Sequence, residues 1–533
     1  MAIFSPSESP AIVVKEVDLT GGVPNVQTTT GAFVGAFRWG PVEQATLIDN
    51  ETRLASTFGA PDDTHTVDYH TAAYFLKYAN ALQIARVVDS DAVNAADSDA
   101  TLIKNTDAFD ANVGLTGQIY ARYPGDIGNS IQVAWTGATS WSGWTAAYKA
   151  QFDAAPTGNE RHILVLDQDG VITGTANSVL ERFPFVSTSS SATNADGSTN
   201  YMNNVVNRSS SYIYLNQLDS ETGAVSLTSG ANGTAPGTGD ILTGWDLFED
   251  KDTIQVDFMI APGKVSSADQ VTIVNDLITI AGTTRKDCMV ITSPSKISVV
   301  NNADPVTAAV AETDTFTFSS YLVVDNNWLK VYDKYNDKYI YIPAASSTAG
   351  IMAASDVNAA PWYSPAGSRR GQLLGITGVS YTPTKSQRDT LYKAGINPIA
   401  NLPGQGVLLF GDKTHLNRPS AFDRINVRRL FLVIERAISL AARNTMFEFN
   451  DEFTRAEFVN IVEPFLREIK GRRGITDFRV VCDETNNTGA VVDRNEFIAN
   501  IFVKPARSIN YITLNFVAVR SGVDFEEVAG LQV

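Results

Sequence analysis

The residue composition and hydrophobic pattern of this sequence change twice along its 533 residues. These changes limit the number of domains that the chain can form. Residues 90–345 consist of short β-prone runs separated by long Ser, Thr, Gly, Asn and Asp stretches, whereas the flanking segments have regular helical and strand patterns. At roughly 150 residues per domain, a chain of this length predicts about three or four domains. With 44% hydrophobic and 19% charged residues, the composition is that of a folded protein. We therefore expect a multidomain α+β fold.

The first segment, residues 1–25, is predicted to be an extended arm. Its prolines exclude a helix, because proline removes a backbone donor and clashes with the preceding turn. A strand at a chain end is not stable alone and must pair with a sheet, either in its own chain or in a neighbouring subunit. The β-prone residues that we expect to make this strand are Ile12, Val13, Val14, Lys15, Glu16 and Val17.

The next two segments, 26–89 and 90–345, are predicted to be separate units. Strands at 31–37 and 81–88 around a helix at 66–80 indicate an α/β segment, which we expect to pack against the second half of the chain. The longer segment is predicted to form one or two β-rich inserted domains that face solvent.

Residues 346–522 have the most regular pattern and are predicted to form an α/β C-terminal domain. Apolar residues at helical spacing indicate a long helix at 427–447. Thr454 and Glu457 have the spacing of a capping box that opens a second helix, which Pro464 should kink. Strands are expected at 478–482, 497–503 and 509–519. The tail 523–533 is predicted to be a second extended arm, with Val523, Asp524, Phe525, Glu526 and Glu527 as its strand.

The charge of the chain limits its partners. A net charge of −17 argues against a nucleic-acid partner, which would require a basic surface. Residues 361–533 hold 22 basic and 18 acidic side chains, whereas residues 1–360 have a net charge of −21. This asymmetry fits an acidic outer part and a near-neutral part engaged in contacts, or it is ordinary variation between domains. We expect neither an export signal nor a membrane span, because the most apolar stretch, 430–442, is interrupted by charges.

The sequence contains no complete catalytic or metal-binding motif. Gly406–Thr414 looks like a phosphate-binding loop, but its spacer is an apolar strand and Lys413 is displaced by one residue. The four histidines lack metal-ligand spacing, and Cys288 and Cys482 lie far apart, as expected for a reducing compartment without a disulfide. We therefore predict no catalytic residues, no cofactor and no metal.

Basic residues form two groups in the last third of the chain. Arg429, Arg436 and Arg443 recur every seven residues on the long predicted helix, so they share one face and could grip an acidic partner. The second group lies at the end of the next helix, where the helix dipole alone would favour it, and consists of Arg467, Lys470, Arg472 and Arg473.

Short motifs in order from residue 9 to residue 527 resemble the tail sheath proteins of contractile phages and related injection systems. Lys413 stands where that family usually has Arg, and Phe449 where Pro is common. The motifs occur in the family's order and are spread over essentially the whole chain, which makes the resemblance specific. The matching segments are Ser9–Asp18, Tyr123–Asn129, Pro365–Gly371, Gly395–Asn397, Gly411–Thr414, Ile425–Leu430, Phe447–Asp451 and Val519–Glu527.

The resemblance implies a polymer without cofactor or covalent chemistry. Sheath subunits form stacked hexameric rings around an inner tube, and contraction drives the tube through the host envelope. The resemblance implies that both arms add strands to sheets in the C-terminal domains of neighbouring subunits. The two basic groups then become candidates for the surface that faces the tube. Expected partners are the chain itself, the inner tail tube protein, and baseplate and tail terminator proteins, with no nucleic acid and no membrane insertion.

The implied location is the virion tail, with assembly in the host cytoplasm. Two other interpretations stay open. One is the homologous sheath of a bacterial contractile injection system, and the other is a nucleotide-binding hydrolase built on Gly406–Thr414.

Overall fold

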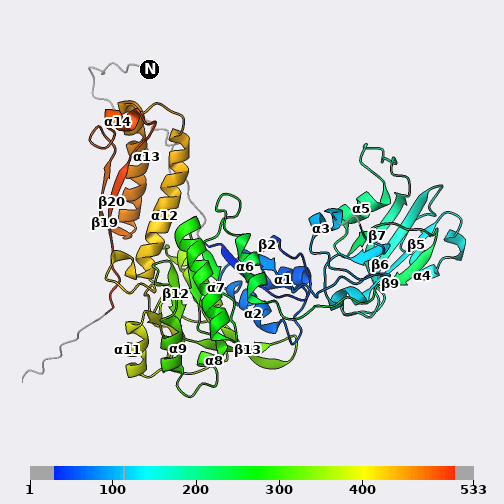
Figure 1. The fold of residues 1–533 in the computed structure, drawn as a ribbon, viewed down its shortest axis with the longest axis horizontal. Helices are drawn as coiled ribbons and strands as arrows, with labels where there is room; N and C mark the ends of the chain where they lie inside the picture. The colour runs from blue at the N-terminus through cyan, green and yellow to red at the C-terminus, as the bar shows by residue number, and fades with distance from the viewer. Residues whose placement is uncertain (1–28, 112–113, 511–533) are drawn as a thin grey trace, which may run out of the picture.

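The computed structural model describes residues 29–111 and 114–510, which form three units in an elongated arrangement (Figure 1). A central α/β unit lies between a β-rich unit, drawn mainly in cyan at one end, and a helical C-terminal unit, drawn in yellow to red at the other. Both predicted arm strands, 12–17 and 523–527, lie outside the described residues, as does nearly all of the predicted strand 509–519. The fold is a multidomain α+β fold.

The central unit is built on a seven-stranded sheet that is parallel except at one edge, in the order β16-β12-β11-β10-β1-β3-β2. Its inner strands are short apolar runs buried on both faces, as expected for parallel strands covered by helices on each side. The strands are β1 Gly31–Gly35, β2 Ala45–Ile48, β3 Leu82–Arg86, β10 Phe258–Ile260, β11 Met289–Thr292, β12 Leu322–Asp325 and β16 Ile396–Asn397.

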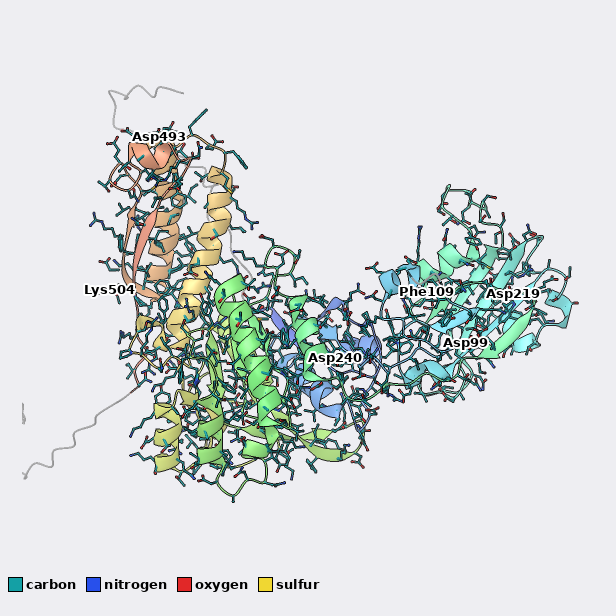
Figure 2. The ribbon with its side chains drawn as sticks, in the orientation of Figure 1. Asp99, Phe109, Asp219, Asp240, Asp493 and Lys504 are labelled. Atoms are coloured by element: carbon teal, nitrogen blue, oxygen red, sulfur yellow. The ribbon has the colours of Figure 1, made fainter. Side chains whose placement is uncertain are left out.

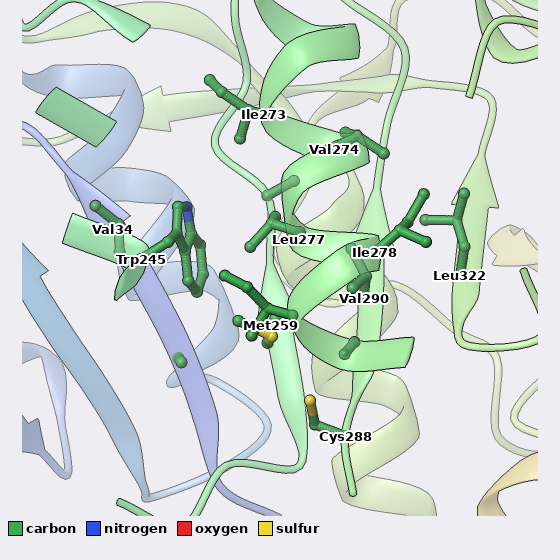
Figure 3. Packing of buried hydrophobic residues seen from close by; sticks show 14 of the residues in the cluster. Val34, Trp245, Met259, Ile273, Val274, Leu277, Ile278, Cys288, Val290 and Leu322 are labelled. Atoms are coloured by element: carbon green, nitrogen blue, oxygen red, sulfur yellow. The ribbon is translucent and has the colours of Figure 1, made fainter. Parts of the chain in front are cut away.

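Helices cover both faces of this sheet. On one face Ile241, Trp245 and Leu277 pack onto Val34 and Met259, and Figure 3 shows Trp245 and Leu277 beside those sheet residues. The helices of that face are α6 Thr238–Asp246, α7 Ser267–Thr279 and α9 Pro305–Thr313. The other face is covered by α2 Thr66–Phe75, α10 Ala345–Asn358 and the first half of α12 Ile425–Ala442.

The sheet topology corrects the predicted boundary at residue 345. Gly31 is paired with Phe258, so residues 238–345 belong to the central unit and not to a β-rich insert. The β-prone runs before and after residue 238 look alike in sequence. In the structure, helices connect β10 to β11 and β11 to β12, which pair parallel, whereas neighbouring strands of the insert pair antiparallel. Smaller elements complete the central unit: α1 Glu51–Phe58, α8 Lys296–Val299, α11 Lys385–Lys393, β13 Trp328–Asp333, β14 Lys338–Pro343, β15 Gly378–Val379, β17 Ile399–Leu402 and β18 Gly406–Leu409.

The β-rich unit therefore spans only about residues 90–232. Its four-stranded antiparallel sheet has the order β7-β6-β5-β9, and alternate side chains such as Val133, Trp135 and Ile163 form a separate core. Its elements are α3 Thr106–Ala111, β4 Ile119–Ala121, β5 Ile131–Gly137, α4 Ala146–Lys149, β6 Glu160–Asp167, β7 Ser178–Ser187, α5 Met202–Ser209, β8 Ile213–Leu215 and β9 Gly223–Ser226.

The C-terminal unit consists of the second half of α12, α13 Glu452–Gly471, α14 Gly489–Val492, and a two-stranded ribbon of β19 Ile475–Val481 and β20 Asn500–Pro505. The predicted helix 427–447 is shorter than expected, because Asn444 and Thr445 are poor helix formers and lie in a 3₁₀ turn. The predicted capping box is also wrong: Asp451 caps α13, its side chain accepting from the Thr454 amide at 2.8 Å.

Candidate interaction surfaces

The N-terminal boundary of the described chain is tied to α12 through one buried carboxylate. Asp257, next to the start of β10, accepts a hydrogen bond from the Thr30 amide at 2.9 Å and forms an ion pair with Arg436 of α12. Arg436 also donates to the carbonyl of Asp287 at 3.0 Å. Burial raises the pKa of Asp257 to about 6, although the charge of Arg436 acts in the opposite direction. Thr30, near the first described residue, is therefore held at a charged contact with α12.

The C-terminal boundary is tied in a similar way to the residue that caps the start of the same helix. Asp412 accepts from the Ser508 hydroxyl at 2.7 Å and from Arg424, the N-cap of α12, at 3.1 Å. Burial acts to raise the pKa of Asp412, but the Ser508 hydrogen bond and the Arg424 charge outweigh it, so the pKa is lowered. Both exits of the described chain are thus anchored by Asp–Arg contacts on α12.

The β-rich unit is held by a different kind of contact, which explains the Tyr123–Asn129 motif. Arg86 of β3 is fully buried and donates to the carbonyls of Phe37, Gly40 and Pro124 at 2.7–2.8 Å. Gly125 has φ +137°, and a Cβ there would lie 2.6 Å from the Arg38 carbonyl oxygen, so this turn requires glycine. The motif is therefore a junction between two units.

The predicted basic stripe on α12 does not lie on an open surface. Arg429 is buried, with its guanidinium paired to Asp356 of α10 and donating to the Met352 carbonyl at 2.9 Å. Arg436 is largely buried against Asp257, and the exposed Arg443 pairs with Asp252 at 2.9 Å. The seven-residue spacing was right about a shared face, but that face packs on the central unit, where desolvated guanidinium groups require carboxylate partners. Arg429 and Arg436 thus pair with carboxylates of the same chain, and their contact with a tube stays a prediction.

The second basic group does lie on the surface, at the C-terminal end of α13. Arg467, Lys470 and Arg472 make exposed ion pairs with Glu463, Asp477 and Glu468 at 3.0–3.8 Å. Arg473 is also exposed and has no ion pair within the described ranges. This end of the unit keeps a net positive charge, as the helix dipole favours.

The ribbon is an incomplete sheet. Ile501 and Val503 of β20 and Phe478 and Val480 of β19 point onto α13 and join the core of the unit, while the alternate residues face outward. Over the residues that the structure describes, β19 pairs only with β20, so the outer edge of each strand carries unpaired backbone groups. A two-stranded ribbon is marginal alone, and an open edge is the part of a sheet to which a further strand can add.

Residues 443–453, which are the connection between α12 and α13 and the first two residues of α13, form an apolar surface that the sequence interpretation missed. We call it the tip. Asn450 fixes it by donating to the Glu496 carbonyl at 2.8 Å, and Arg455 donates to the Asp451 carbonyl at 3.0 Å. An aromatic-rich run that follows the poor helix formers Asn444 and Thr445 could have indicated this surface. The helix predicted at 427–447 included the start of that run, so the surface was not recognised. The exposed fractions are 59% for Met446, 101% for Phe447, 85% for Phe449 and 77% for Phe453.

The geometry does not support a phosphate-binding loop. Gly406–Leu409 is strand β18, antiparallel to β17, and the next helical turn begins only at Ala421, so no helix N-terminus faces the loop. The Lys413 ammonium donates instead to the Tyr392 carbonyl at 2.7 Å. The motif residue Asp412 anchors Ser508 and Arg424, which gives this segment a structural role.

Within residues 29–111 and 114–510, no three His, Cys, Asp or Glu side chains are grouped so that they could hold a metal ion. A small pocket lies at the junction of α12 with β10 and β11. It is lined by the charged residues Asp257, Arg429 and Arg436 and by the apolar residues Met289 and Leu432. No helix in the described part of the chain is long and apolar enough to cross a membrane.

Comparison with known proteins identifies relatives along the whole chain. Residues 234–415 match the model of the phage tail sheath protein central domain, and residues 417–518 match that of the phage tail sheath C-terminal domain. The chain is 30% identical to the tail sheath protein of Vibrio phage KVP40 and 30% identical to that of Enterobacteria phage T4, with 98% of this chain and 99% of each relative covered.

Solved structures show the same fold at low sequence identity. The sheath tail protein Lin1278 from Listeria innocua aligns with a TM-score of 0.58 at 12% identity, covering 91% of this chain and 93% of that chain. The anti-feeding prophage helical sheath in its contracted state aligns with a TM-score of 0.54 at 13% identity, covering 96% of this chain and 99% of that chain.

Proposed function

Because the chain belongs to the phage tail sheath family, we propose that it polymerises as stacked hexameric rings around an inner tube and contracts to drive that tube through the host cell envelope. It is a structural subunit of a contractile tail sheath. The near-complete coverage of phage relatives favours a phage tail over a bacterial injection system, the alternative that the sequence left open.

The observation that carries the proposal is the incomplete sheet of the C-terminal unit. The arm strands 12–17 and 523–527 add to the open edges of a neighbour's ribbon, where their backbone groups complete its hydrogen bonding. Asp257 and Asp412 support this arrangement, because they fix the two chain exits to one rigid helix. Each subunit is then joined to its neighbours through α12.

The remaining surfaces follow from this role. The exposed residues Arg467, Lys470, Arg472 and Arg473 face an acidic surface of the inner tube protein. Baseplate and tail terminator proteins contact the ends of the polymer, which assembles in the host cytoplasm and functions in the virion tail. The subunit needs no catalysis and no cofactor, because the work of contraction comes from the difference between two packings of identical interfaces.

The test is removal of residues 1–22 from the full chain. We expect wild-type protein to sediment as large polymers and the shortened chain to remain small, with an unchanged circular dichroism spectrum and thermal unfolding temperature. Wild-type protein that stays monomeric at high concentration, with both ends intact, would contradict the proposal.

A further inference from the structure

We propose that the tip of one subunit docks on the opposite end of the C-terminal unit of a second copy, in a head-to-tail contact that is separate from the arms. The receiving surface is the base, defined as Lys504, Arg507 and Ile509. This proposal rests on the proposed function, since it names which surfaces of a self-assembling subunit meet.

The tip is an apolar and acidic surface held in a fixed shape. Phe447 and Phe449 are almost fully exposed, and ordering them costs little because Asn450 and Arg455 already brace the loop. Glu448 and Glu452 lie beside them, and neither has an ion-pair partner within the described ranges. A contiguous exposed aromatic group of this kind marks an interaction site on a folded protein.

The base is complementary to the tip. The Ala506 amide donates to the Gly474 carbonyl at 3.0 Å, which places residues 504–507 beside the basic end of α13. Lys504 and Arg507 are exposed and neither forms an ion pair within the described ranges; Asp477, which lies opposite Lys504 in the ribbon, is paired with Lys470. Ile509, which is 81% exposed, supplies the apolar part. Arginine and lysine favour aromatic faces as well as carboxylates, so both features of the tip are matched.

The two surfaces cannot meet within one chain. The 20 residues of α13 separate them, a distance of about 30 Å along the helix. Figure 2 shows the same separation, with Asp493 beside the tip end and Lys504 at the other end of the ribbon. A contact between two different surfaces of identical subunits is heterologous, and it generates rings or helical polymers. A second copy of this chain is therefore the occupant that fits.

The test uses two charge-reversed full-length variants, Glu448→Lys with Glu452→Lys, and Lys504→Glu with Arg507→Glu. We expect each alone to raise the concentration needed for polymerisation at least about tenfold, because like charges then face each other at every contact. An equal mixture of the two should recover to within about threefold of wild type, because each contact then joins a tip and a base of opposite charge. Recovery on mixing also shows that both variants are folded.

A second pair of variants tests the apolar part. Phe447→Ser with Phe449→Ser should weaken polymerisation, whereas Val265→Ser with Val357→Ser, which removes exposed apolar side chains from the central unit, should not. The proposal is overturned if the charge-reversed variants assemble like wild type, if mixing gives no recovery, or if they lose only binding to an inner tube. Wild-type protein that forms no polymer at all would instead contradict the proposed function.

Discussion

The central sheet and the C-terminal ribbon solve the problem of sheet edges in opposite ways. The central sheet has seven strands, is covered by helices on both faces, and ends in short edge strands of four and two residues. The ribbon has strands of seven and six residues and no further partner in the described part of the chain. The most exposed phenylalanines of the described chain, Phe447, Phe449 and Phe453, belong to the C-terminal unit, whereas Phe33, Phe75 and Trp245 of the central unit are fully buried.

This difference indicates a division of labour. The central unit supplies most of the folding free energy through buried apolar surface, so it is complete as a monomer. The C-terminal unit has open strand edges and exposed aromatic side chains, features that are typical of surfaces that other chains bind. Changes in the first unit should therefore alter stability, and changes in the second should alter assembly.

The largest effect is expected from Trp245→Ala in the central unit. Trp245 is fully buried between α6 and the sheet, and truncation leaves a cavity that the surrounding helices cannot close. We expect a loss of about 3–5 kcal/mol in the free energy of unfolding, measured by chemical denaturation. The matched change Phe449→Ala at the exposed tip should cost less than about 0.5 kcal/mol. Equal losses for both variants would contradict the division of labour.

A somewhat smaller effect is expected where the two units meet. Asp257→Ala removes the carboxylate that pairs with the largely buried Arg436, and it removes the acceptor for the Thr30 amide. The expected loss of unfolding free energy is about 2–4 kcal/mol. The same change removes the hydrogen bond that holds Thr30. Polymer formation should therefore also weaken when it is measured well below the unfolding temperature. Weakened stability with unchanged assembly would show that the Asp257 contact with α12 does not influence how the arms assemble.

A pH dependence should distinguish the two units. Burial raises the pKa of Asp325, at the end of β12, to about 7, whereas exposed carboxylates of the C-terminal unit such as Asp477 have lowered values. The folded state therefore retains a proton on Asp325 that the unfolded state releases near pH 4, so this group's stabilising contribution is lost as the pH rises from about 4 to 7. The change is up to about 4 kcal/mol, at about 1.4 kcal/mol per pKa unit.

The variant Asp325→Asn should remove that slope from the pH dependence of the unfolding free energy. The control is Asp477→Asn, whose exposed side chain should leave the slope unchanged. An identical pH profile for wild type and Asp325→Asn would show that this carboxyl is not desolvated as the structure indicates.

The smallest effect on stability is expected from Ser508→Ala, which removes one hydrogen bond to Asp412. We expect a loss of about 0.5–1.5 kcal/mol, because Arg424, Ser364 and Tyr392 still contact that carboxylate. Hydrogen exchange should show faster opening near residue 508 while the central strands stay protected. Opening of the central strands to the same extent would mean that the two units unfold together.

The sequence was sufficient to locate local elements but not to assign them to sheets. Apolar runs and helical spacing predicted β1, β3, α12 and α13 to within a few residues, and these are confirmed. The same local signal could not reveal that β10 pairs with β1, because the register Gly31–Phe258 joins residues more than 200 positions apart. The boundary predicted at residue 345 failed for this reason.

The candidate surfaces show the same limit. Periodicity placed Arg429 and Arg436 on one helix face, but only the tertiary structure reveals that Asp356 and Asp257 cover that face. The tip was not recognised because Phe447 was assigned as the last residue of the predicted long helix, whereas α12 ends at Ala442. The roles of the arm strands, which lie outside the described residues, stay a prediction.

The most direct test of the central claim is electron microscopy of the purified full-length protein. We predict hollow tubes with helical symmetry, because subunits that exchange strands through open ribbons and dock head to tail must form a repeating polymer. Tubes should be absent when residues 1–22 are removed. A uniform field of separate elongated monomers, from protein that is folded and intact at both ends, would contradict the account.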